Sequence, residues 1–199
     1  YHCRGCGHWV QGQPESLFGK SPFGINIIMK VLDMKYRGKD TDAYIRENLQ
    51  RWHGIDLSDG GVNAILDHAA RLFGPSYAAI RQALRDGKVV QADETGWRVE
   101  GENWYAWAFL NPTVTLYHIE NTRGSGVPKE ILKGFSGVLI HDAYQGYNAV
   151  ETVEHGICGV HFLRHTHEIA DREGVSGKAK EFHKAMTWFF RRARKKKKR

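Results

Sequence analysis

Two aspartates in the sequence each follow a short apolar run that is typical of a buried strand. Asp93 follows residues 89–92, and Asp142 follows residues 138–141. In open α/β sheets functional groups gather where strands end, so two parallel neighbouring strands would bring both carboxylates to one edge. Carboxylates that close repel each other, and Mg²⁺ or Mn²⁺ removes the repulsion. Two such ions can hold both the attacking and the leaving oxygen when a phosphodiester bond is displaced. The alternative is that each aspartate is an ordinary turn residue.

Glu94 directly follows Asp93 and adds a third carboxylate to this region. Successive side chains of a strand point to opposite faces of the sheet. We therefore expect Asp93 and Glu94 not to bind the same metal ion, unless the strand ends at Asp93.

A second group of reactive side chains is Cys158, His161 and Arg164. Residues three positions apart lie on one face of a helix. If this helix lies near the aspartates, His161 and Arg164 would orient DNA phosphates or a carboxylate. In the alternative, Cys158 packs in the core and His161 hydrogen-bonds to the backbone.

Cys3 and Cys6 have the spacing of half a zinc site. Tetrahedral zinc needs four ligands, which two such pairs commonly supply. Cys158 is single and cannot provide the second pair, although His2 or His8 would be weak substitutes. Zn²⁺ binding by this motif is thus left open.

Residues 25–86 carry the apolar periodicity of helices, with a last helix expected after Pro75. The turn at residues 54–58 fits a helix-turn-helix, whose second helix would present its early residues to the major groove of DNA. The polar side chains available for such contacts are Asn63, His68 and Arg71. The alternative is a helical bundle that packs on the rest of the protein.

After Gly87 the apolar period changes from 3.6 to 2, which is typical of strands. The expected strands are 88–93, 96–99, 104–110, 114–119 and 137–142, and a short helix is expected to run from Pro128 to Leu132. Residues 149–153 and 158–171 are expected to be helical or mixed, and 181–190 helical. The aromatic strand residues should mostly pack on the sheet, although one of them would also suit stacking on a flipped base: Trp97, Trp104, Tyr105 and Trp107.

The positive charge is concentrated at one end of the sequence. The formal net charge is +7, but residues 191–199 hold eight of the 29 Lys and Arg, which leaves 21 against 22 Asp and Glu. A basic tail of this kind either binds nucleic acid phosphates without sequence preference or is a solvated end.

Composition also limits the class of protein. The sequence has no run of about 18 apolar residues, so we expect no membrane segment. Its three cysteines form no disulfide framework, which favours a reducing, intracellular compartment. The sequence starts at Tyr1 in the middle of a motif, so we expect a fragment.

Longer strings surround the two aspartates. They read Gln-Ala-Asp-Glu-Thr-Gly-Trp over 91–97 and His-Asp-Ala-Tyr-Gln-Gly-Tyr over 141–147. Gly-Phe-Ser-Gly at 134–137 precedes the second string, and Cys-Gly-Val-His-Phe-Leu-Arg at 158–164 follows it. In this order and spacing the sequence closely resembles transposases of the insertion sequence 66 family, within the DDE superfamily. The resemblance covers roughly residues 3–171.

The resemblance implies a ribonuclease-H-like domain in which Asp93 and Asp142 are the first two members of a metal-binding DDE triad. The third member in the family is a glutamate well downstream, in a stretch rich in Glu and Asn. The acidic candidates here are Glu168, Glu173 and Glu181, and none lies in a matching motif. We therefore expect the third carboxylate to be absent. The family's second Cys-x-x-Cys pair would likewise precede Tyr1.

The resemblance implies an α+β chain with four segments. They are half of a zinc-ribbon-like motif (1–12), a helical DNA-binding segment (25–86), a truncated ribonuclease-H-like domain (88–190) and a basic tail (191–199). The implied function is metal-dependent DNA strand cleavage and strand transfer at insertion-element ends, with transposon and target DNA as partners, in the cytoplasm of a prokaryote. A catalytically inactive DNA-binding remnant and a ribonuclease-H-type nuclease are the alternatives. Whether the chain forms a homo-oligomer is left open.

Overall fold

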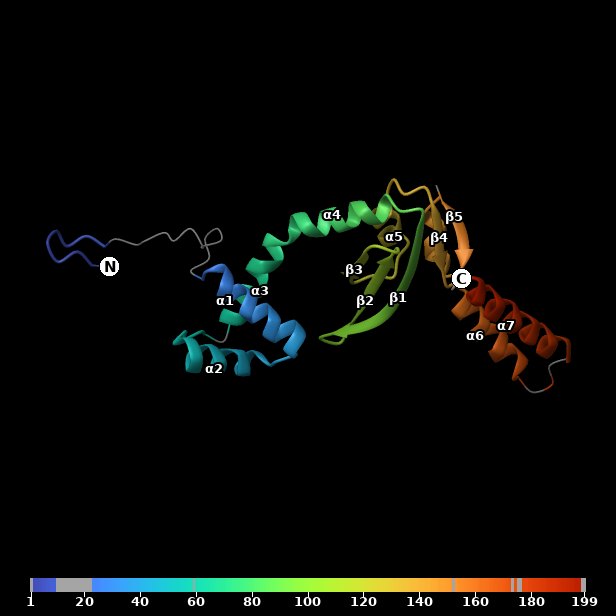
Figure 1. Ribbon diagram of the computed structural model, residues 1–199, viewed down its shortest axis with the longest axis horizontal. Helices are drawn as coiled ribbons and strands as arrows, with labels where there is room; N and C mark the ends of the chain where they lie inside the picture. Colours follow the sequence, from blue (N-terminus) through green and yellow to red (C-terminus); the bar gives the residue numbers. More distant parts are fainter. Residues whose placement is uncertain are drawn as a thin grey trace. The chain divides into compact units, whose positions relative to one another are not determined.

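A computed structural model of the 199-residue chain describes residues 2–9, 23–58, 60–151, 153–172, 174 and 177–197. It divides into two compact units, Tyr1–Pro75 and Ser76–Arg199 (Figure 1). Most of the region between residues 12 and 25, including the predicted end of the first segment at Gly12, lies outside the described residues. None of the described helices combines the length and hydropathy that crossing a membrane requires.

The first unit contains helices, as the apolar periodicity predicts. They are α1 (Ile25–Leu32), its π-helical continuation η1 (Asp33–Gly38), α2 (Asp42–His53) and α3 (Gly61–Leu72). The Thr41 side chain caps α2 by accepting a hydrogen bond from Tyr44 N at 3.3 Å. Gly54 ends this helix in the left-handed conformation, with φ 64°. Local capping signals therefore define α2 at both ends.

The buried residues of these helices form one apolar cluster. Its fully buried members include Ile28 and Val31 of α1, Ile45 and Leu49 of α2, and Val62 of α3. The segment between α2 and α3 is attached to this cluster, because Leu57 is buried and its carbonyl accepts a hydrogen bond from the side chain of Arg46 at 2.9 Å.

The second unit is built on a five-stranded mixed sheet of order β3-β2-β1-β4-β5. Its strands are β1 (Val89–Val99), β2 (Glu102–Leu110), β3 (Thr115–Glu120), β4 (Val138–His141) and β5 (Glu154–Ile157). β1, β2 and β3 form an antiparallel meander, while β4 pairs parallel to both β1 and β5. The helical elements are α4 (Gly74–Arg85), which begins two residues before this unit, α5 (Gly126–Ile131), the 3₁₀ turn η2 (Gln145–Ala149), α6 (Gly159–Ala170) and α7 (Gly177–Lys197).

Three boundaries differ from the sequence-based expectation. The strands predicted at 88–93 and 96–99 are one strand, β1, because residues 93–96 stay paired with β2 and no turn interrupts them. The described residues within 149–153 do not form a helix of their own, since η2 ends at Ala149 and β5, the fifth strand, follows at residue 154. The predicted helix at 181–190 is longer at both ends, and residues 191–197 continue it, since Lys and Arg are good helix formers.

Large aromatic side chains fill the core of the second unit. Trp107 is fully buried, its ring centroid 6.2 Å from that of Phe109 and 5.9 Å from that of Tyr147. The expected packing role of Trp107 is confirmed. Trp97, by contrast, is 55% exposed and contributes little to this core.

Gly137 lets β4 approach β1. A Cβ atom at this position would overlap with the carbonyl oxygen of Lys88 and with the ring of Phe135. The same Lys88 oxygen accepts the hydrogen bond from Val138 N, at 2.9 Å, that begins the pairing of the two strands. The last glycine of the Gly-Phe-Ser-Gly string is therefore required by close backbone approach.

We predict that Gly137→Ala lowers the free energy of unfolding by about 1–3 kcal/mol, because the added methyl group forces β4 away from β1. Gly96→Ala is the matched control, since a Cβ there meets nothing within 4 Å. Urea unfolding followed by tryptophan fluorescence measures both variants. Equal stability of the two variants would show that the strands tolerate the extra atom.

Candidate active site

The pairing of β1 with β4 decides where the two aspartates lie. Val90 is paired with Leu139, and Gln91 with Ile140. Asp93 and Asp142 each come two residues after the second pair, so they lie at the same level of adjacent, parallel strands. The prediction that these two strands are parallel neighbours is confirmed. From this register we expect the two carboxylates to lie about 4–7 Å apart, the range in which they can share metal ions.

Asp93 lies within β1 and on its exposed face. Its neighbours Val90 and Ala92 are buried on the other face, and Asp93 itself is exposed. One carboxylate oxygen, Oδ1, accepts a hydrogen bond from Glu94 N at 3.1 Å. Oδ2 has no hydrogen-bond partner among the described residues, which leaves it available to a ligand.

Asp142 begins the loop that follows β4. Its Oδ1 accepts a hydrogen bond from Tyr144 N at 2.9 Å. The residue between them, Ala143, has φ 74°, a left-handed conformation that is costly for a side chain other than glycine. This tight turn holds the Asp142 carboxylate in one orientation.

A pair of histidines joins β4 and β5 beside Asp142. His141 is 4% exposed, and its Nε2 lies 3.1 Å from Nδ1 of His155. Because Nδ1 of His141 accepts from Ala143 N at 3.1 Å, its proton must be on Nε2, which then donates to His155. Burial, together with the nearby His155, lowers the pKa of His141, so the neutral form of His141 is favoured.

Glu94 lies on the face of β1 opposite to Asp93, as predicted. Its side chain is only 1% exposed, and its Oε1 accepts two hydrogen bonds from Arg123, at 2.9 and 2.6 Å. Its Oε2 accepts a hydrogen bond of 2.5 Å from the hydroxyl of Tyr147. Burial raises the pKa of Tyr147, and the bond to Glu94 raises it further. Glu94 is therefore a buried anchor and does not face the same side as Asp93.

Tyr144 completes this group of side chains. Its ring stacks under Arg123, with the guanidinium carbon 4.0 Å from the ring centroid, and its hydroxyl donates to the Arg123 carbonyl at 2.8 Å. We call Glu94, Arg123, Tyr144 and Tyr147 the Glu94 clamp, in which Glu94 and Tyr147 are buried and Arg123 is partly exposed. It connects β1, the segment before α5 and the loop after Asp142. Residues of the two long sequence strings thus interact with each other, a role that sequence reasoning did not assign to them.

A groove of about 570 Å³ opens beside Asp142. Helix α6 starts next to it, because Cys158 N donates to the carbonyl of His141 at 2.7 Å. The residues that line the groove are Asp142, Ala143, Ile157, His161, Phe162, Arg164, His165 and Glu168. The structure therefore brings His161 and Arg164 together with Asp142. It adds His165, which had no assigned role, and Glu168, one of the acidic candidates for the third carboxylate.

His161 has an unusual environment in this groove. Its Nδ1 is buried and makes no hydrogen bond within the described part of the chain. The alternative, a hydrogen bond between His161 and the backbone, is therefore not formed at Nδ1. A buried imidazole nitrogen without a partner costs free energy, which a bound ligand or water would recover.

Other predicted site residues lie in the first unit. Asn63 and Arg71 are exposed on α3, and His68 is half-buried. Cys3 and Cys6 flank a small turn in which Cys3 N donates to the carbonyl of His8 at 2.9 Å, and hydrogen bonds within the turn lower the pKa of Cys3. Across the described residues, no three His, Cys, Asp or Glu side chains gather as a metal-binding cluster.

Comparisons with known proteins point to one family. The family model described as Transposase IS66 family matches residues 20–199. Among solved structures, the chain is similar to the HTLV-2 integrase catalytic core domain in complex with magnesium, in its trimeric form. The identity is 10% and the TM-score 0.30, over 50% of this chain and 82% of the other. No curated protein matches the chain at a significant level.

We predict that Glu94 and Tyr147 stabilise the fold jointly. Glu94→Gln and Tyr147→Phe should each lower the free energy of unfolding by about 1–3 kcal/mol, since each leaves a buried polar group without its partner. The double variant should lose about 1 kcal/mol less than the sum of the two. Urea unfolding measures the cycle, with Tyr117→Phe, at an exposed tyrosine, as the control. Strict additivity would contradict the clamp.

Proposed function

Because the chain belongs to the Transposase IS66 family, we propose that it carries the metal-binding part of an enzyme that cuts DNA strands at insertion-element ends and joins them to target DNA. The observation that best supports the proposal is the parallel register of β1 and β4, which aligns Asp93 with Asp142. In this proposal the two aspartates hold Mg²⁺ or Mn²⁺.

The donor atoms fit such an ion. Carboxylate oxygens are the ligands that Mg²⁺ prefers, and it commonly uses one or two of them together with waters and substrate phosphates. Asp93 and Asp142 each use Oδ1 for a backbone N–H, which fixes the carboxylate and leaves Oδ2 without a partner among the described residues. When bound, the ions would supply Lewis-acid activation of the attacking and leaving oxygens.

The groove beside Asp142 suits the sugar-phosphate backbone of a DNA strand. Arg164 and His165 are exposed there, and an arginine fork matches the geometry of a phosphate. The buried Nδ1 of His161 would gain the hydrogen bond that it lacks if a phosphate or a bridging water entered. We propose that Arg164 and His161 position the phosphodiester, while the aspartates hold the metal.

The Glu94 clamp would keep the aspartates aligned. It attaches the loop after Asp142 to β1, the strand that carries Asp93, through the hydrogen bonds that Glu94 accepts from Arg123 and Tyr147. A rigid support of this kind keeps the metal ligands at a fixed spacing, which phosphodiester displacement by two ions requires.

The third carboxylate remains the open part of the proposed site. Glu168 lines the same groove as Asp142, but its Oε2 lies 4.0 Å from Nδ1 of His165, and it forms no three-residue cluster within the described structure. Glu181 lies on α7, and Glu173 is outside the described residues. This favours the second candidate function, a DNA-binding remnant without catalytic activity, for the chain alone.

We predict that the 199-residue chain binds Mn²⁺ weakly and that Asp93→Asn and Asp142→Asn each weaken the binding by about tenfold, because each removes one of two carboxylates. Isothermal titration calorimetry measures the affinity. Asp171→Asn, at an exposed position that ends α6, is the matched control and should not change it. Unchanged affinity in both active-site variants would refute the metal site.

Strand cleavage of a labelled element end in Mg²⁺ or Mn²⁺ separates enzyme from remnant. The chain alone should not cleave or join DNA, whereas a longer chain that includes the family's downstream glutamate should do both and lose both in Asp93→Asn or Asp142→Asn. Cleavage by the present chain that disappears in Glu168→Gln, Glu173→Gln or Glu181→Gln would place the third ligand within these residues.

For α3, we predict that Asn63→Ala and Arg71→Ala each weaken binding to the element end by about fivefold or more, if this helix reads base edges. Arg37→Ala is the control, since Arg37 is 88% exposed outside α3. Gel-shift titration against element-end and scrambled duplexes measures the difference. Equal binding by all three variants would favour the plain helical bundle.

A further inference from the structure

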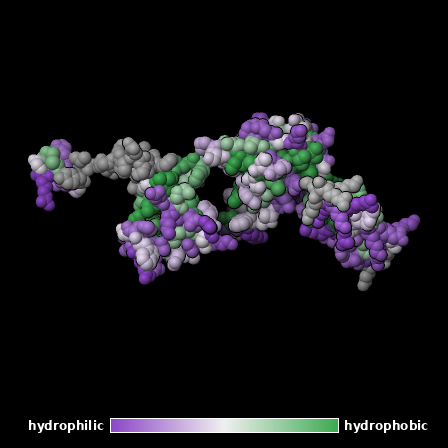
Figure 2. Space-filling model, viewed as in Figure 1, coloured by the Kyte–Doolittle hydropathy of each residue, from purple (hydrophilic) through white to green (hydrophobic). Residues whose placement is uncertain are grey.

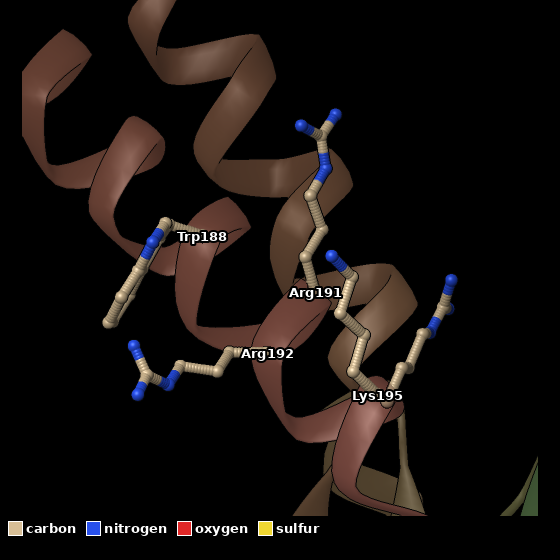
Figure 3. A pocket seen from close by; sticks show the side chains of 5 residues that line it. Trp188, Arg191, Arg192 and Lys195 are labelled. Carbon is tan, nitrogen blue, oxygen red and sulfur yellow. The ribbon is translucent and has the colours of Figure 1, made fainter. Parts of the chain in front are cut away.

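The C-terminal helix α7 presents aromatic and cationic side chains outside the candidate active site. Trp188, Arg191, Arg192 and Lys195 have the spacing of one helix face, and with Arg194 they line an open depression of about 540 Å³ (Figure 3). We call the first four residues the α7 stripe. We propose that it binds single-stranded DNA, with Trp188 stacking on an unpaired base and the cations holding neighbouring phosphates.

The stripe lies on a helix that is held in place by α6. Phe162 of α6 packs against Phe182 and Phe190 of α7, with ring centroids 6.3 and 6.4 Å apart. Gly159 has no room for a side chain because the ring of Phe190 occupies that space. The two helices thus form a packed hairpin, and the face of it in view is mostly hydrophilic (Figure 2).

The charge of the stripe suits a polyanion. Within the described part of the chain no ion pair neutralises its three cations, and the only acidic residue of α7 is Glu181, seven positions before Trp188. Phosphates bound at such cations release condensed counterions, which favours binding at low salt. The helix rises about 10 Å from Trp188 to Lys195, so the cations can contact more than one phosphate.

The aromatic component favours an unpaired strand over a duplex. Trp188 is 60% exposed, and the guanidinium of Arg192 lies 5.2 Å from its ring centroid. Figure 3 shows the Arg192 side chain beside the indole. An indole extended by a guanidinium is a platform on which any base stacks, but bases in a duplex are already stacked on each other. A lipid surface is the alternative that binding to vesicles tests, since Phe189 is also exposed on this basic helix.

The proposal does not rest on metal chemistry, so the full chain is tested in EDTA. Fluorescence anisotropy with a labelled strand of mixed sequence, and with its duplex, gives both affinities over a range of salt concentrations. Trp188→Leu should weaken single-strand binding by about tenfold and duplex binding by less than about threefold. Phe189→Leu is the matched control, since Phe189 is 56% exposed next to the stripe, and it should change neither affinity.

A second pair of variants tests the cations. Arg191→Gln with Lys195→Gln should reduce the salt slope of single-strand binding by about 1.4, or about 0.7 for each phosphate that is no longer neutralised. Lys178→Gln with Lys180→Gln removes the same charge at two other positions of the same helix and should leave the slope unchanged. Circular dichroism checks that each variant remains folded.

Three results would overturn the proposal. They are unchanged single-strand affinity in Trp188→Leu, an equal loss of duplex affinity in that variant, or binding to vesicles of anionic lipid without binding to single strands. None of these results tests the proposal that Asp93 and Asp142 support DNA cleavage. Conversely, a longer chain with the family's downstream glutamate that binds single strands but does not cleave DNA would contradict the proposed function and not the proposal for the α7 stripe.

Discussion

The parallel pairing of β1 with β4 is the constraint on which the second unit depends. It begins where the backbone of Gly137 approaches Lys88, and it aligns residues 93 and 142 through backbone pairing. Backbone hydrogen bonds, rather than the carboxylates, offset the cost of bringing two negative charges to one level of the sheet. β5 then pairs with β4, and the groove opens beside the end of the same strand.

Features that depend on local sequence were predictable. Apolar runs before Asp93 and Asp142 indicate buried strands, and alternation along a strand places Glu94 on the other face. The predicted strands at 88–93 and 96–99 are nevertheless one strand, because the polar residues 93–96 carry the composition of a turn and only their partners on β2 keep them extended. β5 was missed since its four residues, Glu154–Ile157, have almost no strand signal of their own.

Features that depend on contacts distant in sequence were not predictable. Arg123 has no motif around it, and it pairs with Glu94 across 29 positions. The roles of Tyr144 and Tyr147 likewise become visible only when the loop after Asp142 folds back on β1. In α6 the three-residue spacing indicated a shared face for His161 and Arg164, and it is the start of the helix beside His141 that brings this face to Asp142.

The adjacency of Asp93 and Glu94 on a continuous strand has a consequence for how the protein tolerates insertions. Asp93 and Glu94 face opposite sides of the sheet only because one occupies an odd and the other an even position along β1. One residue added or removed between Lys88 and Asp93 would exchange the two faces. It would turn an aspartate toward Tyr147 and Arg123, and a longer glutamate toward the solvent side of the sheet. Sequence length in this strand is therefore as strict a requirement as residue identity, whereas the hairpin tip at residues 100–101 is free of that restriction.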